Sequence, residues 1–116
     1  MKPSALFIIT GDPRTSARPA EAIRIAAGVG TWKKADITVY LRGPAVLALG
    51  EFVDELIDED NFLRYLPIVG EFGRPIYVQQ GAAELRELGE PSLAYEAIND
   101  ARLAQLAAHS NHVLRF

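Results

Sequence analysis

The apolar run at residues 5–9, ALFII, constrains the fold of this chain more than any other feature. The run is continuous, whereas a strand with one face in water alternates apolar and polar residues. A continuous run of this length is typical of a strand buried on both faces, as in a parallel sheet with helices on either side. The run ends at Thr10 and Gly11, which begin a turn. The sequence therefore predicts an α/β protein that begins with a buried parallel strand.

Segments with strand character and helix character alternate along the rest of the chain. Further strands are predicted at residues 37–41, 75–78, 93–98 and 112–116, although the Ala and Glu content of residues 93–98 is unusual for a strand. Helical segments are predicted at residues 19–29, 46–57, 61–69, 82–88 and up to 107, the last capped by Asn99 or Asp100. Residues 46–57 form either one helix or a pair of helical turns interrupted near Gly50. This alternation is typical of βαβ units. We therefore predict a single three-layer α/β/α domain over residues 1–116, with a mostly parallel sheet of about five strands.

Composition excludes several classes of function. The 116 residues contain no cysteine, so this chain has no disulfide, thiolate metal site or thiol chemistry. Its net charge is −3, whereas a nucleic-acid-binding domain normally presents a basic stripe. The apolar run at residues 5–9 is too short for a signal-peptide core or a membrane span. We therefore expect a cytoplasmic protein that binds neither nucleic acid nor membranes.

Three turns are candidate binding sites, because open parallel sheets bind ligands beyond the carboxyl ends of their strands. The candidate ligand-binding residues in these turns are Thr10, Gly11, Asp12, Arg14, Arg42, Gly43, Gln79, Gln80 and Gly81. The first turn combines hydroxyl groups, a glycine and the positive charges of Arg14 and Arg18 before a helix N-terminus, which could hold a small anion. The alternative is a solvated turn in which Asp12 and Ser16 cap backbone groups and the arginines pair with nearby acids.

Neither a catalytic set nor a metal-ligating set is predicted. His109 and His112 lack a third ligand at metal-binding spacing, and the acidic run at residues 51–60 lacks the glycine of a calcium loop. That run is interpreted as a solvated face. The serines lie in turns and both histidines lie near the C-terminus, so no Ser-His-Asp arrangement is readable. We therefore expect no catalytic residue, no metal and no cofactor.

The chain resembles the DsrE/DsrF-like (TusD-related) family of small α/β proteins over nearly its whole length. The resemblance rests on five motifs, which are ALFIITGDP, PAEAIRIAAG, ITVYLRGPAVLAL, IYVQQGAAELRELG and LAQLAAHSNHVLRF. Each motif is a hydrophobic pattern with a few small residues. Several members of this family act in sulfur relay. The resemblance implies an α/β fold of the DsrE type for this chain.

In the sulfur-carrying members of the family, a cysteine just after the third strand accepts a persulfide. The resemblance places that cysteine within residues 79–81, where this chain has Gln79, Gln80 and Gly81. A carboxamide is neither a nucleophile nor a persulfide carrier, so the family activity is not expected here. Relatives are commonly homotrimers, homohexamers or assemblies in which some subunits lack the cysteine. The resemblance therefore implies a homo-oligomer, or an assembly with related subunits.

Two hypotheses for the function follow. The first is a non-catalytic DsrE-like binding or assembly protein, whose turns at Gln79, Gln80, Arg42 and Thr10 hold a small ligand or a partner. Glutamine suits this role because its amide donates and accepts hydrogen bonds without a charge to desolvate. The second is an enzyme or carrier for a small anionic ligand, such as phosphate, a nucleotide or a sulfur oxyanion, held by the strand-end arginines.

Overall fold

The computed structural model describes residues 2–116, which contain a five-stranded sheet. The strands are β1 (Ser4–Ile9), β2 (Asp36–Leu41), β3 (Ile76–Gln79), β4 (Tyr95–Ile98) and β5 (His112–Arg115). Their order across the sheet is β4-β3-β2-β1-β5, and all four neighbouring pairs are parallel. The predicted sheet of about five mostly parallel strands is thereby confirmed.

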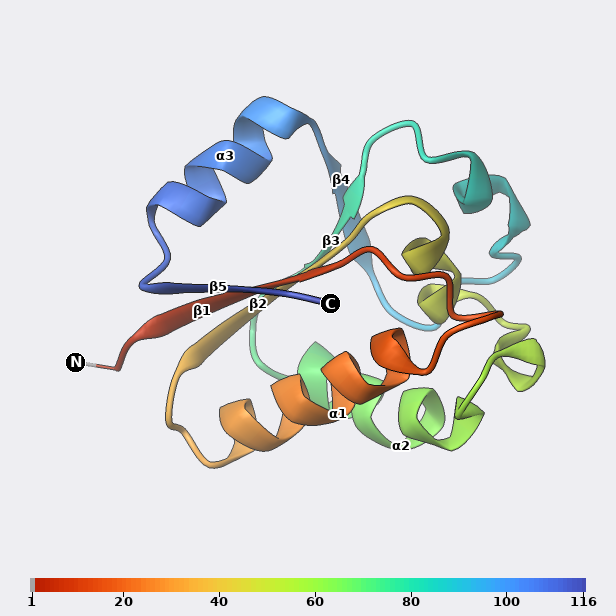
Figure 1. Ribbon diagram of the computed structural model, residues 1–116, viewed down its shortest axis with the longest axis horizontal. Helices are drawn as coiled ribbons and strands as arrows, with labels where there is room; N and C mark the ends of the chain where they lie inside the picture. Colours follow the sequence, from red (N-terminus) through yellow and green to blue (C-terminus); the bar gives the residue numbers. More distant parts are fainter. Residues whose placement is uncertain (1) are drawn as a thin grey trace.

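Helices cover both faces of the sheet, which gives the predicted three layers (Figure 1). The α-helices are α1 (Arg18–Thr31), α2 (Glu59–Gly70) and α3 (Asp100–Ala108). Three 3₁₀ segments lie between these elements, and they are η1 (Gly43–Leu49), η2 (Val53–Glu55) and η3 (Ala83–Glu87). Figure 1 shows α1 and α2 side by side below the sheet and α3 alone above it. Within residues 2–116, none of these helices is long and apolar enough to cross a membrane.

The continuous apolar run in β1 serves two separate cores. Phe7 and Ile9 point into the larger core, which α1 and α2 cover, whereas Leu6 and Ile8 point into a smaller core under α3. Successive residues of a strand point to opposite faces, so a strand between two helical layers must be apolar at every position. The burial of all residues from Ala5 to Ile9 confirms the prediction that this strand is covered on both faces.

Residues 43–55 form a pair of helical turns, η1 and η2. The sequence allowed either this pair or a single helix. The first of them, η1, begins three residues earlier than predicted, because Gly43 adopts a left-handed φ of 57° and Pro44 then fits the first helical turn. Gly50 ends η1 in an extended conformation. The resulting pair of short turns leads the chain from the carboxyl end of β2 back to α2.

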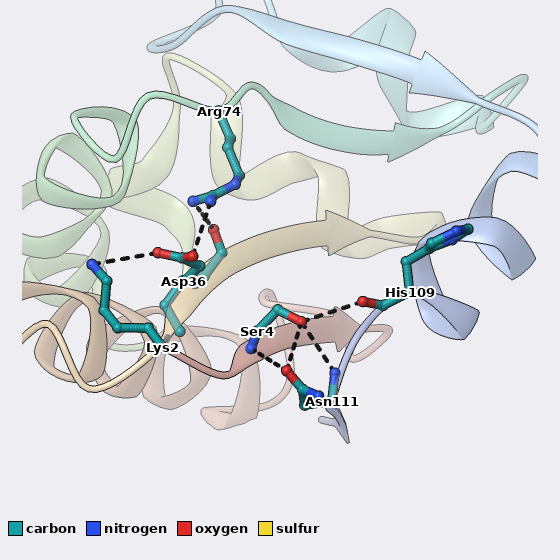
Figure 2. A network of polar contacts seen from close by, with 7 residues as sticks. Lys2, Ser4, Asp36, Arg74, His109 and Asn111 are labelled. Atoms are coloured by element: carbon teal, nitrogen blue, oxygen red, sulfur yellow. Dashed lines mark hydrogen bonds and ion pairs between the residues drawn. The ribbon is translucent and has the colours of Figure 1, made fainter.

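Polar contacts hold the amino ends of the strands together (Figure 2). The backbone N–H of Ser4 donates to Oδ1 of Asn111 at 2.8 Å, and the N–H of Asn111 donates to Oγ of Ser4 at 3.1 Å. Asp36, at the start of β2, forms ion pairs with Lys2 at 3.5 Å and Arg74 at 3.7 Å. These contacts fix where β1, β2 and β5 begin, and leave the carboxyl ends of the strands as the candidate ligand-binding edge.

Candidate functional site

Thr10 and Arg42 lie next to each other at the carboxyl ends of β1 and β2. The N–H of Arg42 donates to the carbonyl of Ile9 at 2.9 Å, which continues the parallel pairing one step beyond the strands. On the other side of β1, the N–H of Thr10 donates to the carbonyl of Phe116 at 2.8 Å. The sheet backbone therefore fixes the positions of both predicted residues.

The guanidinium group of Arg42 is held between the sheet and the start of α3. Its Nη1 donates to Oδ1 of Asp100 at 2.9 Å and to the hydroxyl of Tyr40 at 3.1 Å. The Asp100 carboxylate, followed by the Tyr40 hydroxyl, raises the pKa of Arg42 above its ordinary value. The side chains of Arg42 and Asp100 are 37% and 77% exposed, so their ion pair orients the guanidinium but adds little to stability.

A groove of about 470 Å³ runs between α3 and the carboxyl ends of β1, β2 and β5. We call it the strand-end groove. Four polar residues line it, and its apolar surface comes from Ile8 and α3; the polar residues are Thr10, Arg42, Asp100 and Arg115. A concave surface that is largely apolar with a few oriented polar groups is the usual form of a small-ligand site. The two arginines against one aspartate favour an anionic group in this groove.

Gln79, the last residue of β3, makes a structural contact with the turn after β2. Its Oε1 accepts a hydrogen bond at 2.9 Å from the N–H of Gly43, the residue whose left-handed φ begins η1. This bond joins the turn after β2 to the end of β3. Gln79 is half-buried, and the bond gives the carboxamide oxygen a partner within the fold.

Gln80 and Gly81 have a different environment. The side chain of Gln80 is exposed, and its backbone N–H donates to the carbonyl of Ile98 at 2.9 Å, which extends the pairing of β3 with β4. Gly81 is exposed and has a left-handed φ of 80°, as its position in the turn requires. Among Gln79, Gln80 and Gly81, Gln79 alone uses its side chain in a hydrogen bond within residues 2–116.

Arg14 pairs with Asp12 inside the first turn. Its Nε and Nη2 donate to the two carboxylate oxygens of Asp12, both at 3.0 Å. The same hydrogen bonds hold the pKa of Asp12 below its ordinary value. Backbone N–H groups of Thr15 and Ser16 donate to the carbonyl of Asp12 at 3.1 and 2.9 Å. This geometry matches the alternative in which the turn is structural, with its arginine paired to an acid.

The first turn and the strand-end groove are separate places. Arg14 lines a smaller pocket of about 170 Å³ with Phe52 and Glu87, whereas Arg42 lines the strand-end groove. Gly11 lies where a Cβ would stand 3.2 Å from the ring of Pro19, so it permits the close approach of α1. The structure therefore brings Thr10, Arg42, Gly43 and Gln79 to one edge and leaves Arg14 outside the groove.

Sequence reasoning missed Tyr40, Asp100 and Arg115. Tyr40 lies in β2 two residues before Arg42, and the parallel pairing continues to Arg42, so the two-residue period of a strand could have placed both side chains on one face. Asp100 was expected only as an alternative cap for α3, but Asn99 is the cap and accepts a hydrogen bond from the N–H of Arg102 at 2.9 Å. The carboxylate of Asp100 is thereby left to pair with Arg42.

Comparison with known proteins gave a family and a fold. A family model described as the DsrE/DsrF-like family matches residues 4–116. The crystal structure of the YchN protein from E. coli superposes with a TM-score of 0.80 and 19% sequence identity, covering 100% of both chains. At this identity the superposition shows a shared fold. No curated protein matches the sequence. Because the family model spans nearly all of its residues, the chain belongs to the DsrE/DsrF-like family.

Proposed function

We propose that this chain is a non-catalytic binding and assembly protein of the DsrE/DsrF-like family. It holds a small ligand or a partner group in the strand-end groove and carries no persulfide. Its proposed setting is the cytoplasm, in a homotrimer, a homohexamer or an assembly with related subunits. The observation that carries the proposal is the hydrogen bond between Gln79 and Gly43, in the turn that bears the reactive cysteine of sulfur-carrying relatives.

The chemistry of Gln79 supports a role in structure and binding. A neutral carboxamide has no nucleophilic electron pair comparable to that of a thiolate, so it cannot accept sulfur from a persulfide donor. The oxygen of this carboxamide already accepts from the N–H of Gly43 at 2.9 Å. The chain also has no other residue that could carry sulfane sulfur as a thiol, because it contains no cysteine.

The strand-end groove supports binding. The guanidinium of Arg42 is oriented before any ligand arrives, since Tyr40 and Asp100 fix it. Binding therefore costs little free energy for ordering this side chain. The hydroxyl of Thr10 and the second arginine, Arg115, line the same groove beside the apolar side chain of Ile8. These groups suit a small molecule, or a partner side chain, that joins an anionic group to an apolar part.

A second candidate function is an enzyme or carrier for a small anionic molecule. The observation that favours it is the presence of both Arg42 and Arg115 on one groove, because two guanidinium groups can hold a phosphate or a sulfur oxyanion. A ligand that binds and is recovered chemically unchanged would favour the binding protein over an enzyme. Turnover of the bound molecule, followed by NMR of the recovered ligand, would favour the second.

Ligand binding is tested by thermal shift and calorimetry with phosphate, adenine nucleotides, sulfite and thiosulfate. We expect an anionic ligand to stabilise the wild type and Arg14→Gln equally, and to have no effect on Arg42→Gln. Arg14→Gln is the matched control, because Arg14 lies outside the strand-end groove. An anion that stabilises Arg42→Gln as much as the wild type would place its site elsewhere.

The absence of sulfur transfer is tested separately, by treating the protein with a persulfide donor and measuring cyanide-reactive sulfur. We expect none on the wild type. Gln79→Cys and Gln80→Cys provide the positive comparison, since each restores a thiol to the turn after β3. Cyanide-reactive sulfur that remains bound to the purified wild type would contradict the proposed function.

A further inference from the structure

Trp32 is the most exposed large apolar side chain in the described part of the chain. It is 76% exposed at the end of α1, and it is the only tryptophan in the sequence. Lys33 and Lys34 follow it, both exposed, and neither forms an ion pair within residues 2–116. We call residues 32–34 the Trp32 segment. An indole ring presented in this way has a large apolar surface that binding can remove from water.

The backbone of the Trp32 segment is fixed by the end of α1. The N–H of Trp32 donates to the carbonyl of Gly28 at 3.1 Å, and the N–H of Lys33 donates to that of Gly30 at 3.0 Å. Lys33 has a left-handed φ of 58°, and the N–H of Lys34 returns to the carbonyl of Val29 at 3.3 Å. The segment is therefore preorganised, so a partner that binds it does not have to order its backbone.

A groove of about 440 Å³ lies beside α2, and we call it the α2 groove. Its apolar lining includes Leu63, Leu66 and Leu93. The side chain of Leu63 is 61% exposed, whereas α2 buries Phe62, Leu66 and Val69 in the core. Two carboxylates, those of Glu51 and Glu90, also line the groove. The α2 groove is therefore apolar at its centre and acidic at its margin.

The charges of the two surfaces are complementary. Neither Glu51 nor Glu90 forms an ion pair among the described residues, and the acidic run at residues 51–60 begins at this groove. Lys33 and Lys34 form the only adjacent pair of basic residues in the sequence. If the two surfaces meet, the indole enters the apolar groove and the lysines face the carboxylates at its margin. A buried apolar centre with a charged rim is the usual form of a protein–protein interface.

We propose that the Trp32 segment of one copy of this chain docks in the α2 groove of a second copy. The indole of Trp32 packs against Leu63 and Leu93, and the lysines face Glu51 and Glu90. The segment and the groove are different surfaces, so the contact is heterologous and each copy offers one of each. Such contacts form a ring when the rotation between copies closes. This inference deepens the assembly part of the proposed function and rests on it.

Tryptophan fluorescence tests the contact directly, because Trp32 is the only indole in the chain. Emission and acrylamide quenching are measured across a dilution series of the full chain, with light scattering on the same samples. We expect the emission to shift to shorter wavelength and the quenching to fall as the oligomer forms. Trp32→Ala is expected to raise the dissociation constant of the oligomer by about 30-fold or more, as truncation of a central anchor does.

A mixing experiment identifies the groove. Leu63→Asp places a charge in the α2 groove but keeps the indole, whereas Trp32→Ala removes the indole but keeps the groove. Leu63 is largely exposed, so its replacement leaves the core intact. Alone, Leu63→Asp should show an exposed indole at every concentration. The Trp32→Ala variant has no indole and so contributes no tryptophan emission, but it keeps an intact groove. Adding it should therefore shift the tryptophan emission of Leu63→Asp to shorter wavelength.

Three outcomes would overturn the proposal. A wild type that oligomerises with its indole still exposed refutes the contact and leaves assembly standing. A wild type that stays a monomer refutes both the contact and the assembly part of the proposed function. Shielding of the indole in Leu63→Asp alone shows that Trp32 docks on another surface. Val113→Asp is the matched control, because Val113 is an exposed apolar residue that does not line the α2 groove, and it should behave as the wild type.

Discussion

Replacing Gln79 by alanine measures what the carboxamide contributes to the turn after β2. The change removes the acceptor of the 2.9 Å hydrogen bond from the N–H of Gly43 and leaves that half-buried donor to find water. A hydrogen bond of this kind contributes about 1 kcal/mol, and a fully buried orphaned donor would cost more. We therefore expect Gln79→Ala to lower the free energy of unfolding by about 1 kcal/mol, which corresponds to roughly 4 °C in Tm for a domain of this size.

Urea denaturation followed by circular dichroism measures this loss, and the m value should not change. Gln80→Ala is the matched control. The exposed side chain of Gln80 has no hydrogen bond to lose among residues 2–116, so its replacement should stay within about 0.5 kcal/mol of the wild type. Gln79→Glu keeps an acceptor oxygen and should retain most of the stability. Equal losses at positions 79 and 80 would refute the structural role that we assign to Gln79.

Three further predictions concern the turns and helix ends. Arg14 holds the pKa of Asp12 below its ordinary value of 3.8, so the Asp12 carboxylate stabilises the fold above that pH and loses this effect as the pH falls below it. The stability gap between the wild type and Asp12→Asn should narrow on acidification in urea titrations; a gap independent of pH would contradict the pairing. Gly43→Ala should destabilise by about 1–2 kcal/mol, because a φ of 57° is strained for alanine although the space around it is open. Gly28→Ala should stabilise by about 0.5–1 kcal/mol, since this exposed helical position also has open space; calorimetric shifts of the same sign for both glycine variants would refute the conformational argument.

The first strand was predictable because its burial between two helical layers requires a continuous apolar run. β1 lies between two helical layers, so every position from Ala5 to Ile9 is apolar. β4 lies at the edge of the sheet and three of its four residues are exposed, so its segment carried little hydrophobic signal, and the strand begins at Tyr95 instead of residue 93. The sequence predicted a helical start at residue 46, whereas η1 begins at Gly43. The prediction was late because a glycine followed by a proline is typical of a turn, and the left-handed φ of Gly43 is not visible in the sequence.

The candidate site was only partly predictable, because it depends on strand order. The rule for parallel sheets selects the carboxyl ends of the strands, which is enough to bring Thr10 and Arg42 together. Arg115 reaches the same groove only because β5 lies beside β1, and the sequence does not reveal that neighbour. For Arg14 the sequence left open an anion site or a pairing with a nearby acid, and in the structure the carboxylate of Asp12 pairs with it within the turn. Local pairing of this kind depends on loop geometry, which hydrophobic periodicity does not encode.

The position of β5 has a consequence for synthesis. β1 pairs with β5 from Ala5 opposite His112 to Ile8 opposite Arg115 (Figure 1). Of the five strands of this sheet, β1 is synthesised first and its second neighbour, β5, is synthesised last. At translation speeds of about 5–20 residues per second, the nascent chain exposes one edge of β1 for several seconds. During that time the edge offers unpaired N–H and C=O groups to any extended peptide nearby. A nascent chain stalled before residue 112 would therefore present its most hydrophobic strand as an open template, and chaperone binding in that interval would protect it.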